Sequence, residues 1–212
     1  MYDLLTLPGP QDHHQGYLSA PLVLVKYGDY QCPHCCKSDL AFKAARRILG
    51  ERLCIVFRQF PRREIHPCAE RSAELAEAAA SQGLFWAMHG MLFENQELLD
   101  DDSLRRYAQR IGLDRMTVAE AFSGHYRTKV RQDVEDALRS GVEEAPCFFI
   151  NGRRYAGDPD ADELLQVLQE VLVEIKTGTA WKSSFKREIP PGGWSIPVSS
   201  GIEQHSTGMR PF

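Results

Sequence analysis

The segment DYQCPHCCKSD, residues 29–39, concentrates side chains that could do chemistry. Three cysteines fall within five positions, and a proline and a histidine separate Cys32 from Cys35. Two thiols at this spacing lie about one turn apart if they begin a helix, which is within reach of a disulfide bond. The same residues could instead form one corner of a metal site, or be small buried side chains. The rest of the sequence has to distinguish these three interpretations.

A helix is predicted to start at this segment. The apolar run PLVLVKY (21–27) indicates a buried strand, and Pro33 suits the first turn of a helix that ends near Leu49. Unpaired backbone N–H groups and the positive end of the helix dipole favour a thiolate there, and His34 can add positive charge. We therefore expect the pKa of Cys32 to fall from about 8.5 into the range of about 3.5 to 7.5.

A zinc site would need a second pair of ligands at matching spacing. Cys54, Cys68 and Cys147 are isolated in the sequence, and His66 beside Cys68 is the only hint of a pair. An exposed corner between a strand and a helix is also a poor place to bury three cysteines. A redox pair is therefore favoured over both alternatives, and no metal ligand is assigned.

The order of the predicted elements indicates an α/β fold with an inserted helical subdomain. A second apolar strand (53–60) follows the first helix, giving the strand–helix–strand unit typical of parallel pairing. Helical patterns then occupy the chain until CFFI (147–150), and the pair Asn151-Gly152 signals a hairpin before a last amphipathic helix from about 160 to 175. The expected segments are an irregular lead-in (1–20), the first part of the core (21–63), the helical insertion (64–140), the second part of the core (141–176) and a C-terminal tail (177–212).

Several segments together resemble the DsbA-like branch of the thioredoxin superfamily. These are YGDYQCPHC, FRQFP, HPCAERSAELAEAA, GLFWAMHGMLFENQ and GVEEAPCFFINGRRY, and the resemblance covers about residues 15–172. It implies a thioredoxin fold with an inserted helical subdomain, in agreement with the element pattern. It also implies that Cys32 attacks a substrate disulfide, that Cys35 resolves the mixed disulfide, and that Ala145 and a cis Pro146 bind substrate backbone beside them. No metal or organic cofactor is implied.

The chain departs from the family at two positions near the expected site. Six residues before the first cysteine, relatives commonly place an acidic residue that serves proton transfer, whereas this chain has Lys26. Lys26 either reaches toward the sulfurs and favours the thiolate, or lies on an exposed margin of the sheet. Cys147, directly after the proline, is either a third thiol near the pair or a small core residue on a strand.

Composition limits the partners. The chain has 212 residues, 43% of them hydrophobic, and a net charge of −4, which permits a sizeable core and argues against nucleic acid as the main partner. No apolar stretch approaches the roughly 20 residues of a membrane span, and the amino terminus has no pattern typical of a secretory signal, so we expect a cytoplasmic protein. The expected partners are protein or peptide thiols and disulfides, with glutathione or a thioredoxin-type protein as reductant.

The predicted function is thiol–disulfide exchange by an oxidoreductase. Pro-His between the cysteines favours an oxidant, whereas a cytosolic glutathione pool favours a reductase or isomerase, so the direction stays open. The first alternative is a non-catalytic redox-sensing or partner-binding module, fused or docked to a larger protein. The second alternative is a zinc-binding module.

Overall fold

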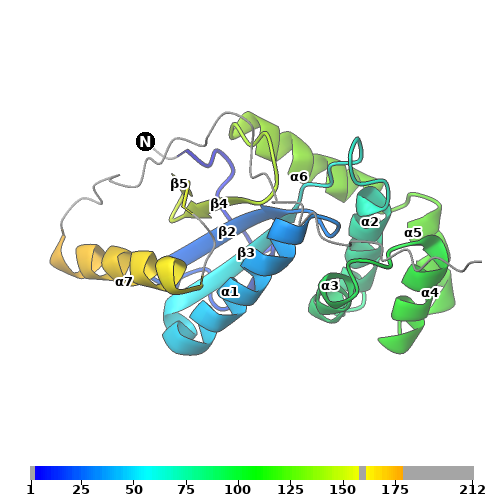
Figure 1. Cartoon of the computed structure of the whole chain (residues 1–212), viewed down its shortest axis with the longest axis horizontal. Coiled ribbons are helices and arrows are strands. Elements are labelled where there is room, and N and C mark those ends of the chain that lie inside the picture. Colours follow the sequence, from blue (N-terminus) through cyan, green and yellow to red (C-terminus); the bar gives the residue numbers. More distant parts are fainter. Residues whose placement is uncertain (1–2, 158–160, 179–212) are drawn as a thin grey trace, which may run out of the picture.

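The structure, a computed structural model, describes residues 3–157 and 161–178 (Figure 1). Its strands are β1 (His13–Gln15), β2 (Leu22–Gly28), β3 (Leu53–Gln59), β4 (Cys147–Ile150) and β5 (Arg153–Tyr155). Its helices are α1 (Pro33–Leu49), the short 3-10 helix η1 (Gly50–Arg52), α2 (Ala69–Ala80), α3 (Phe85–Glu94), α4 (Asp101–Arg110), α5 (Arg115–Phe122), α6 (Arg127–Arg139) and α7 (Ala161–Thr177).

The strands form a single mixed sheet in the order β1-β3-β2-β4-β5. Strands β2 and β3 are parallel and are connected by α1, as the strand–helix–strand pattern predicts. Strand β4 joins β2 in antiparallel orientation after the chain has passed through α2–α6. In Figure 1, α1 and α7 cover one face of the sheet, α6 covers the other, and α2–α5 gather at one end. The expected α/β fold with a helical insertion is therefore confirmed.

Both faces of the central strands are buried, and this explains why β2 and β3 have nearly continuous apolar sequences. On β2, Leu22 and Leu24 pack in the core under α1 and α7, whereas Val25 and Tyr27 belong to the core on the opposite face. Side chains alternate along a strand, so Lys26 shares the α1 side with the two leucines. This register directs Lys26 toward the N-terminal end of α1.

The hairpin between β4 and β5 is the one that the Asn-Gly pair predicts. Asn151 (φ 48°) and Gly152 (φ 77°) both have left-handed backbone conformations, which a two-residue turn of this type requires. The Asn151 side chain also accepts a hydrogen bond from the backbone N–H of Val23 at 2.7 Å. The turn is thereby fixed to the start of β2.

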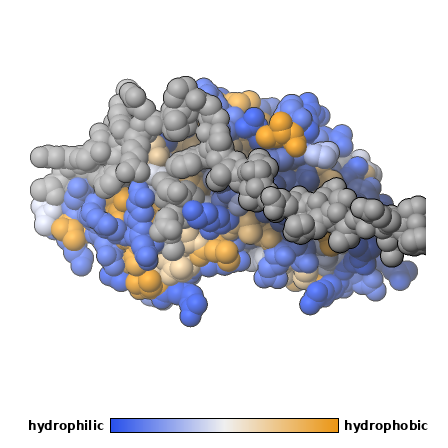
Figure 2. Space-filling view, in the orientation of Figure 1, coloured by the Kyte–Doolittle hydropathy of each residue, from blue (hydrophilic) through white to orange (hydrophobic). Residues whose placement is uncertain are grey.

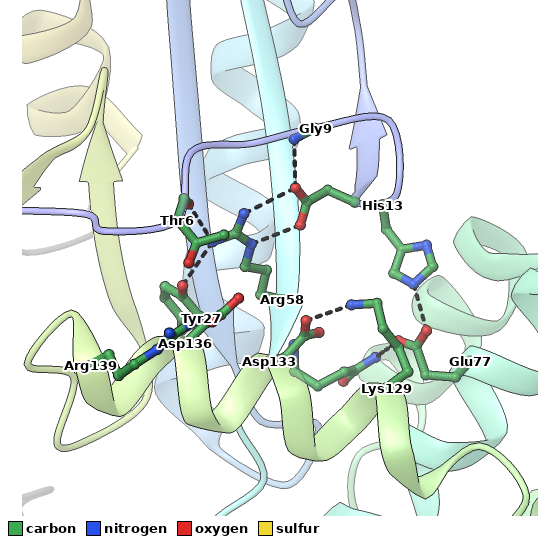
Figure 3. Close-up of polar contacts among 12 residues, drawn as sticks. Thr6, Gly9, His13, Tyr27, Arg58, Glu77, Lys129, Asp133, Asp136 and Arg139 are labelled. Atoms are coloured by element: carbon green, nitrogen blue, oxygen red, sulfur yellow. Dashed lines mark hydrogen bonds and ion pairs between the residues drawn. The ribbon is translucent and has the colours of Figure 1, made fainter.

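The N-terminal lead-in contains a strand that the sequence does not predict, because HHQ has no apolar alternation. β1 pairs with β3 in antiparallel orientation, and a buried ion pair holds the preceding turn (Figure 3). The Arg58 guanidinium donates to both carboxylate oxygens of Asp12, at 2.7 and 3.0 Å, and also to the Tyr27 hydroxyl and the Thr6 carbonyl. Arg58 therefore ties residues 6–12 to the sheet.

A second polar cluster joins the sheet to the helical insertion (Figure 3). His13 of β1 contacts the Glu77 carboxylate of α2 at 2.8 Å, and the Gln59 side chain donates to the same carboxylate. The backbone N–H of Gln59 donates to Asp133 of α6, which also pairs with Lys129. The end of β3 is thus hydrogen-bonded to both α2 and α6.

On the face shown in Figure 2, hydrophilic side chains predominate and apolar ones form small, separate groups. Among the described residues, no helix has the length and apolar character that crossing a membrane would require. Helix α7 ends at Thr177, and residues 179–212 of the predicted tail lie outside the described residues.

Candidate active site

Cys32 and Cys35 lie at the start of α1, where the sequence predicts them. Cys32 is the N-cap residue, with φ −80° and ψ 117°, and Pro33 is the first helical residue. The backbone N–H of Cys35 donates to the Cys32 carbonyl at 3.0 Å, so the two residues are one turn apart. Cys32 is 5% exposed and Cys35 is fully buried, which makes Cys32 the more accessible thiol.

The two thiols have opposite pKa shifts. The pKa of Cys32 is lowered to about 7, mainly by a hydrogen bond from the Cys35 thiol. Burial opposes this shift, whereas the backbone N–H groups of Cys35 and His34 add to it. Burial raises the pKa of Cys35 well above its usual range, and donation to Cys32 raises it further. At neutral pH the accessible thiol is therefore the one that ionises.

His34 follows Pro33 in the first turn of α1. It contributes to the lowered pKa of Cys32 through its backbone N–H at the helix start. The imidazole Nε2 is buried and has no hydrogen-bond partner among the described residues. Pro33 and His34 thus support Cys32 through the geometry of the first turn.

The loop before β4 faces Cys32. The Cys32 thiol donates to the Ala145 carbonyl at 3.4 Å, and the Ala145–Pro146 peptide bond is cis. Cys147 points away from this site, because its side chain packs with Val56 and Phe149 in the core on the α6 side of the sheet. Burial raises the pKa of Cys147 to about 11. Of the two interpretations of Cys147, the structure supports the core residue.

The comparisons with known proteins agree with this geometry. A family model described as thioredoxin matches residues 9–170. The chain belongs to the thioredoxin family. Among solved structures, alpha-DsbA1 of Wolbachia pipientis matches with a TM-score of 0.70 and 20% identity, over 84% of this chain and 99% of that one. BdbD of Bacillus subtilis matches with a TM-score of 0.68 and 19% identity, over 76% and 93%. The expected DsbA-like thioredoxin fold is confirmed, and this fold supports thiol–disulfide exchange.

The curated relatives carry a different kind of name. "Na(+)/H(+) antiporter NhaA 1" of Mycobacterium sp. (strain KMS) is 39% identical over 176 residues, which are 78% of this chain and 28% of that protein. The protein of the same name in Salinispora arenicola is 36% identical over 190 residues, 88% of this chain and 28% of that protein. The chain therefore spans about a quarter of the length of these relatives.

In this thioredoxin-family chain, Lys26 is buried on β2, with 1% exposure. Its Nζ donates to the Cys35 carbonyl at 2.7 Å and lies 3.9 Å from a carboxylate oxygen of Asp39. The alternative of an exposed sheet margin is therefore wrong. Asp39 and its partner His89 are not among the residues predicted from the sequence. The signal for Asp39 is its place four positions after Cys35, on the same side of α1.

A buried carboxylate shapes the other side of the site. Asp29 accepts hydrogen bonds from the backbone N–H groups of Gln31 and Arg62 and contacts His66 Nδ1 at 2.8 Å. The Gln31 side chain in turn accepts from the backbone N–H of Cys68. His66, the only hint of a zinc ligand pair, is thus bound to a carboxylate that anchors the loop beside Cys32. Within residues 3–157 and 161–178, no three potential metal-ligating side chains are grouped as a metal ion would require.

Proposed function

We propose that the chain exchanges disulfides with protein or peptide substrates through Cys32 and Cys35. The observation that carries this proposal is the position of the two thiols: they lie one turn apart at the start of α1, and Cys32 is the less buried of the pair. The Cys35 thiol lowers the pKa of Cys32 to about 7, and burial raises the pKa of Cys35. The thiolate is the nucleophile in disulfide exchange. Cys32 is therefore the attacking residue, and Cys35 is the resolving residue.

The reaction proceeds in two balanced steps. The Cys32 thiolate attacks a substrate disulfide, which forms a mixed disulfide and releases one substrate thiolate. Cys35 then attacks the Cys32 sulfur, forms the Cys32–Cys35 disulfide and releases the second substrate thiol. The Ala145 carbonyl lies 3.4 Å from the Cys32 sulfur, so a substrate that reaches this sulfur passes Ala145 and Pro146. We assign these two residues to the binding of substrate backbone.

The pKa of Cys32 bears on direction. A value of about 7 lies at the upper end of the range of about 3.5 to 7.5 for such motifs. A less stabilised thiolate makes the disulfide less oxidising. This favours a reductase or isomerase that receives its electrons from glutathione or a thioredoxin-type reductant. Equilibration of the pair in glutathione buffers measures the reduction potential; a value as oxidising as about −120 mV would contradict this direction.

Reduction of insulin by dithiothreitol tests the exchange itself. The wild-type protein should accelerate it, Cys32→Ser should abolish the acceleration, and Cys35→Ser should accumulate mixed disulfides with substrate. Cys54→Ala is the matched control, because Cys54 is a buried thiol on β3 with a pKa raised to about 11 by burial. A wild-type protein without effect on insulin, or a Cys54→Ala variant as impaired as Cys32→Ser, would refute the assignment.

The second candidate function is a redox-sensing or partner-binding module of a membrane protein. The curated relatives named Na(+)/H(+) antiporter support it, because the region similar to this chain is about a quarter of each of those proteins. A module of this kind would bind a sodium–proton antiporter and respond to its thiols. Co-sedimentation of the protein with antiporter-containing vesicles, compared with antiporter-free vesicles, tests this function independently of the insulin assay.

The cytoplasmic location and the zinc alternative stay predictions. Cell fractionation followed by immunoblotting tests the location, and recovery in the membrane fraction would instead favour the antiporter-associated module. Metal analysis of the purified protein tests the zinc alternative.

A further inference from the structure

A chain of buried polar groups lies beneath Cys35. Lys26 of β2 donates from Nζ to the Cys35 carbonyl at 2.7 Å, and the Asp39 carboxylate of α1 lies 3.9 Å from the same nitrogen. Burial of an isolated ammonium is too costly to be tolerated. Asp39 provides the negative charge that offsets it, four residues after Cys35 on the same helix.

Asp39 is itself held by groups from two helices. His89 Nε2 of α3 lies 2.9 Å from one carboxylate oxygen, and Lys43 Nζ lies 2.9 Å from the other. Burial lowers the pKa of His89 to about 4, so at neutral pH its ring is uncharged and donates from Nε2. The other ring nitrogen accepts from the Tyr30 hydroxyl at 3.1 Å. Burial opposes ionisation of Asp39, but the His89 hydrogen bond and Lys26 bring its pKa below the usual range.

Aromatic rings complete the surroundings of the ammonium. Lys26 Nζ lies 4.7 Å from the centre of the Phe93 ring, 5.5 Å from that of Phe42 and 5.7 Å from that of Phe57. Ring faces attract cations at these distances. Burial lowers the pKa of Lys26, whereas Asp39 and the cysteines at the start of α1 oppose this shift.

The charge on Lys26 acts on the resolving thiol. Burial and the contact with Cys32 raise the pKa of Cys35, and the charge of Lys26 opposes this rise. The main causes that set the pKa of Cys32 are different: the Cys35 thiol, burial, backbone N–H groups and the charge of Asp29. The Lys26 ammonium therefore favours ionisation of Cys35, the thiol that reacts in the second step.

We propose that Asp39 and His89 hold Lys26 as an ammonium beneath Cys35, where it stabilises the Cys35 thiolate during the resolving step. The proposal deepens the thiol–disulfide exchange proposed above and rests on it. The Cys35 thiolate attacks the Cys32 sulfur, the Cys32–Cys35 bond forms, and the bond from Cys32 to the substrate breaks. The substrate leaves as a thiolate, which takes up the proton that Cys35 has given up. Asp39 and His89 are positioning residues, since they act through Lys26.

Ellman's reagent separates the two steps, because each releases one coloured aromatic thiolate. The reduced protein, in excess over the reagent, is mixed with it, and the release of the aromatic thiolate is followed by stopped flow. Attack by Cys32 gives a first phase whose rate depends on concentration, and resolution by Cys35 gives a second phase whose rate does not. The half-buried thiols Cys36 and Cys68 are replaced by alanine in every protein, so that the signal comes from the pair.

Asp39→Asn and Lys26→Met should each slow the second phase about tenfold, the factor by which a rise of one pKa unit in Cys35 reduces its thiolate fraction. The pH midpoint of the second phase should rise by about one unit, while the first phase changes less than about twofold. Asp133→Asn is the matched control. Asp133 is also a buried carboxylate paired with a lysine, but it lies on α6, on the other side of the sheet, so both phases should stay as in wild type.

An unchanged second phase in folded Asp39→Asn would overturn the proposal, and so would equal slowing of both phases. If Lys26→Met does not fold, Asp39→Asn decides the test through its pH profile. Failure of the exchange function has a different signature: the wild-type protein would then release no second equivalent of aromatic thiolate. The two ideas can therefore fail separately.

Discussion

Replacement of Cys35 should raise the pKa of Cys32, and the size of the rise depends on whether the new side chain can donate a hydrogen bond. The structure lowers the pKa of Cys32 to about 7, with the Cys35 thiol as the main cause. The shift of roughly 1.5 units from the ordinary value of about 8.5 corresponds to roughly 2 kcal/mol in favour of the thiolate. Cys35→Ala removes the donor, so we expect a pKa above about 8 and, at pH 7, a fall in thiolate from about half to less than about a tenth. Cys35→Ser retains an O–H donor and should give a smaller rise.

The rate of alkylation of Cys32 by iodoacetamide, measured across pH, reports this pKa. All variants also carry Cys36→Ala, so that Cys32 is the more exposed of the thiols that remain at the start of α1. His34→Ala retains the backbone N–H that contributes to the shift and should preserve that contribution. If Cys35→Ala and Cys35→Ser both titrate like the wild-type protein, the hydrogen bond between the thiols is not what activates Cys32. A larger rise in His34→Ala than in Cys35→Ala would assign the activation to the imidazole instead.

Three further predictions concern stability. Arg58→Met leaves Asp12 as a buried unpaired carboxylate, so the free energy of unfolding in urea should fall by about 3–5 kcal/mol. A loss below about 1 kcal/mol would show that the ion pair is dispensable. Gly28→Ala would place a Cβ 2.6 Å from the Phe57 ring and should cost about 1–3 kcal/mol, detectable by thermal melting, and an unchanged melting temperature would contradict it. Burial lowers the pKa of His89 to about 4 in the folded protein, below the usual value of about 6.5, so the stability that the neutral ring contributes is fully present above pH 6.5 and is lost as the pH falls toward 4. His89→Gln should therefore lose less stability than wild type between pH 7 and 5, as measured by urea unfolding at both pH values.

Local sequence determined the pair of cysteines and the elements beside them. Pro33 at the first helical position, the apolar run of β2 before it and the spacing of the two cysteines place both thiols in one helical turn. Asn151-Gly152 determined the hairpin, because few other residue pairs adopt two successive left-handed conformations. These features depend on residues that are close in the chain, so their backbone preferences can be recognised without a partner.

Tertiary structure alone decided the surroundings of the sulfurs. Lys26, Asp39 and His89 come from a strand and two helices, and their contacts exist only because the fold brings α1 and α3 together beside Lys26. The side on which Cys147 lies, away from Cys32, follows from the antiparallel register of β4 against β2. The short strand β1 is likewise held by the Asp12–Arg58 contact across 46 positions. The local sequence does not indicate such contacts, because they stabilise the protein only when folding removes the charged groups from water and places them beside one another.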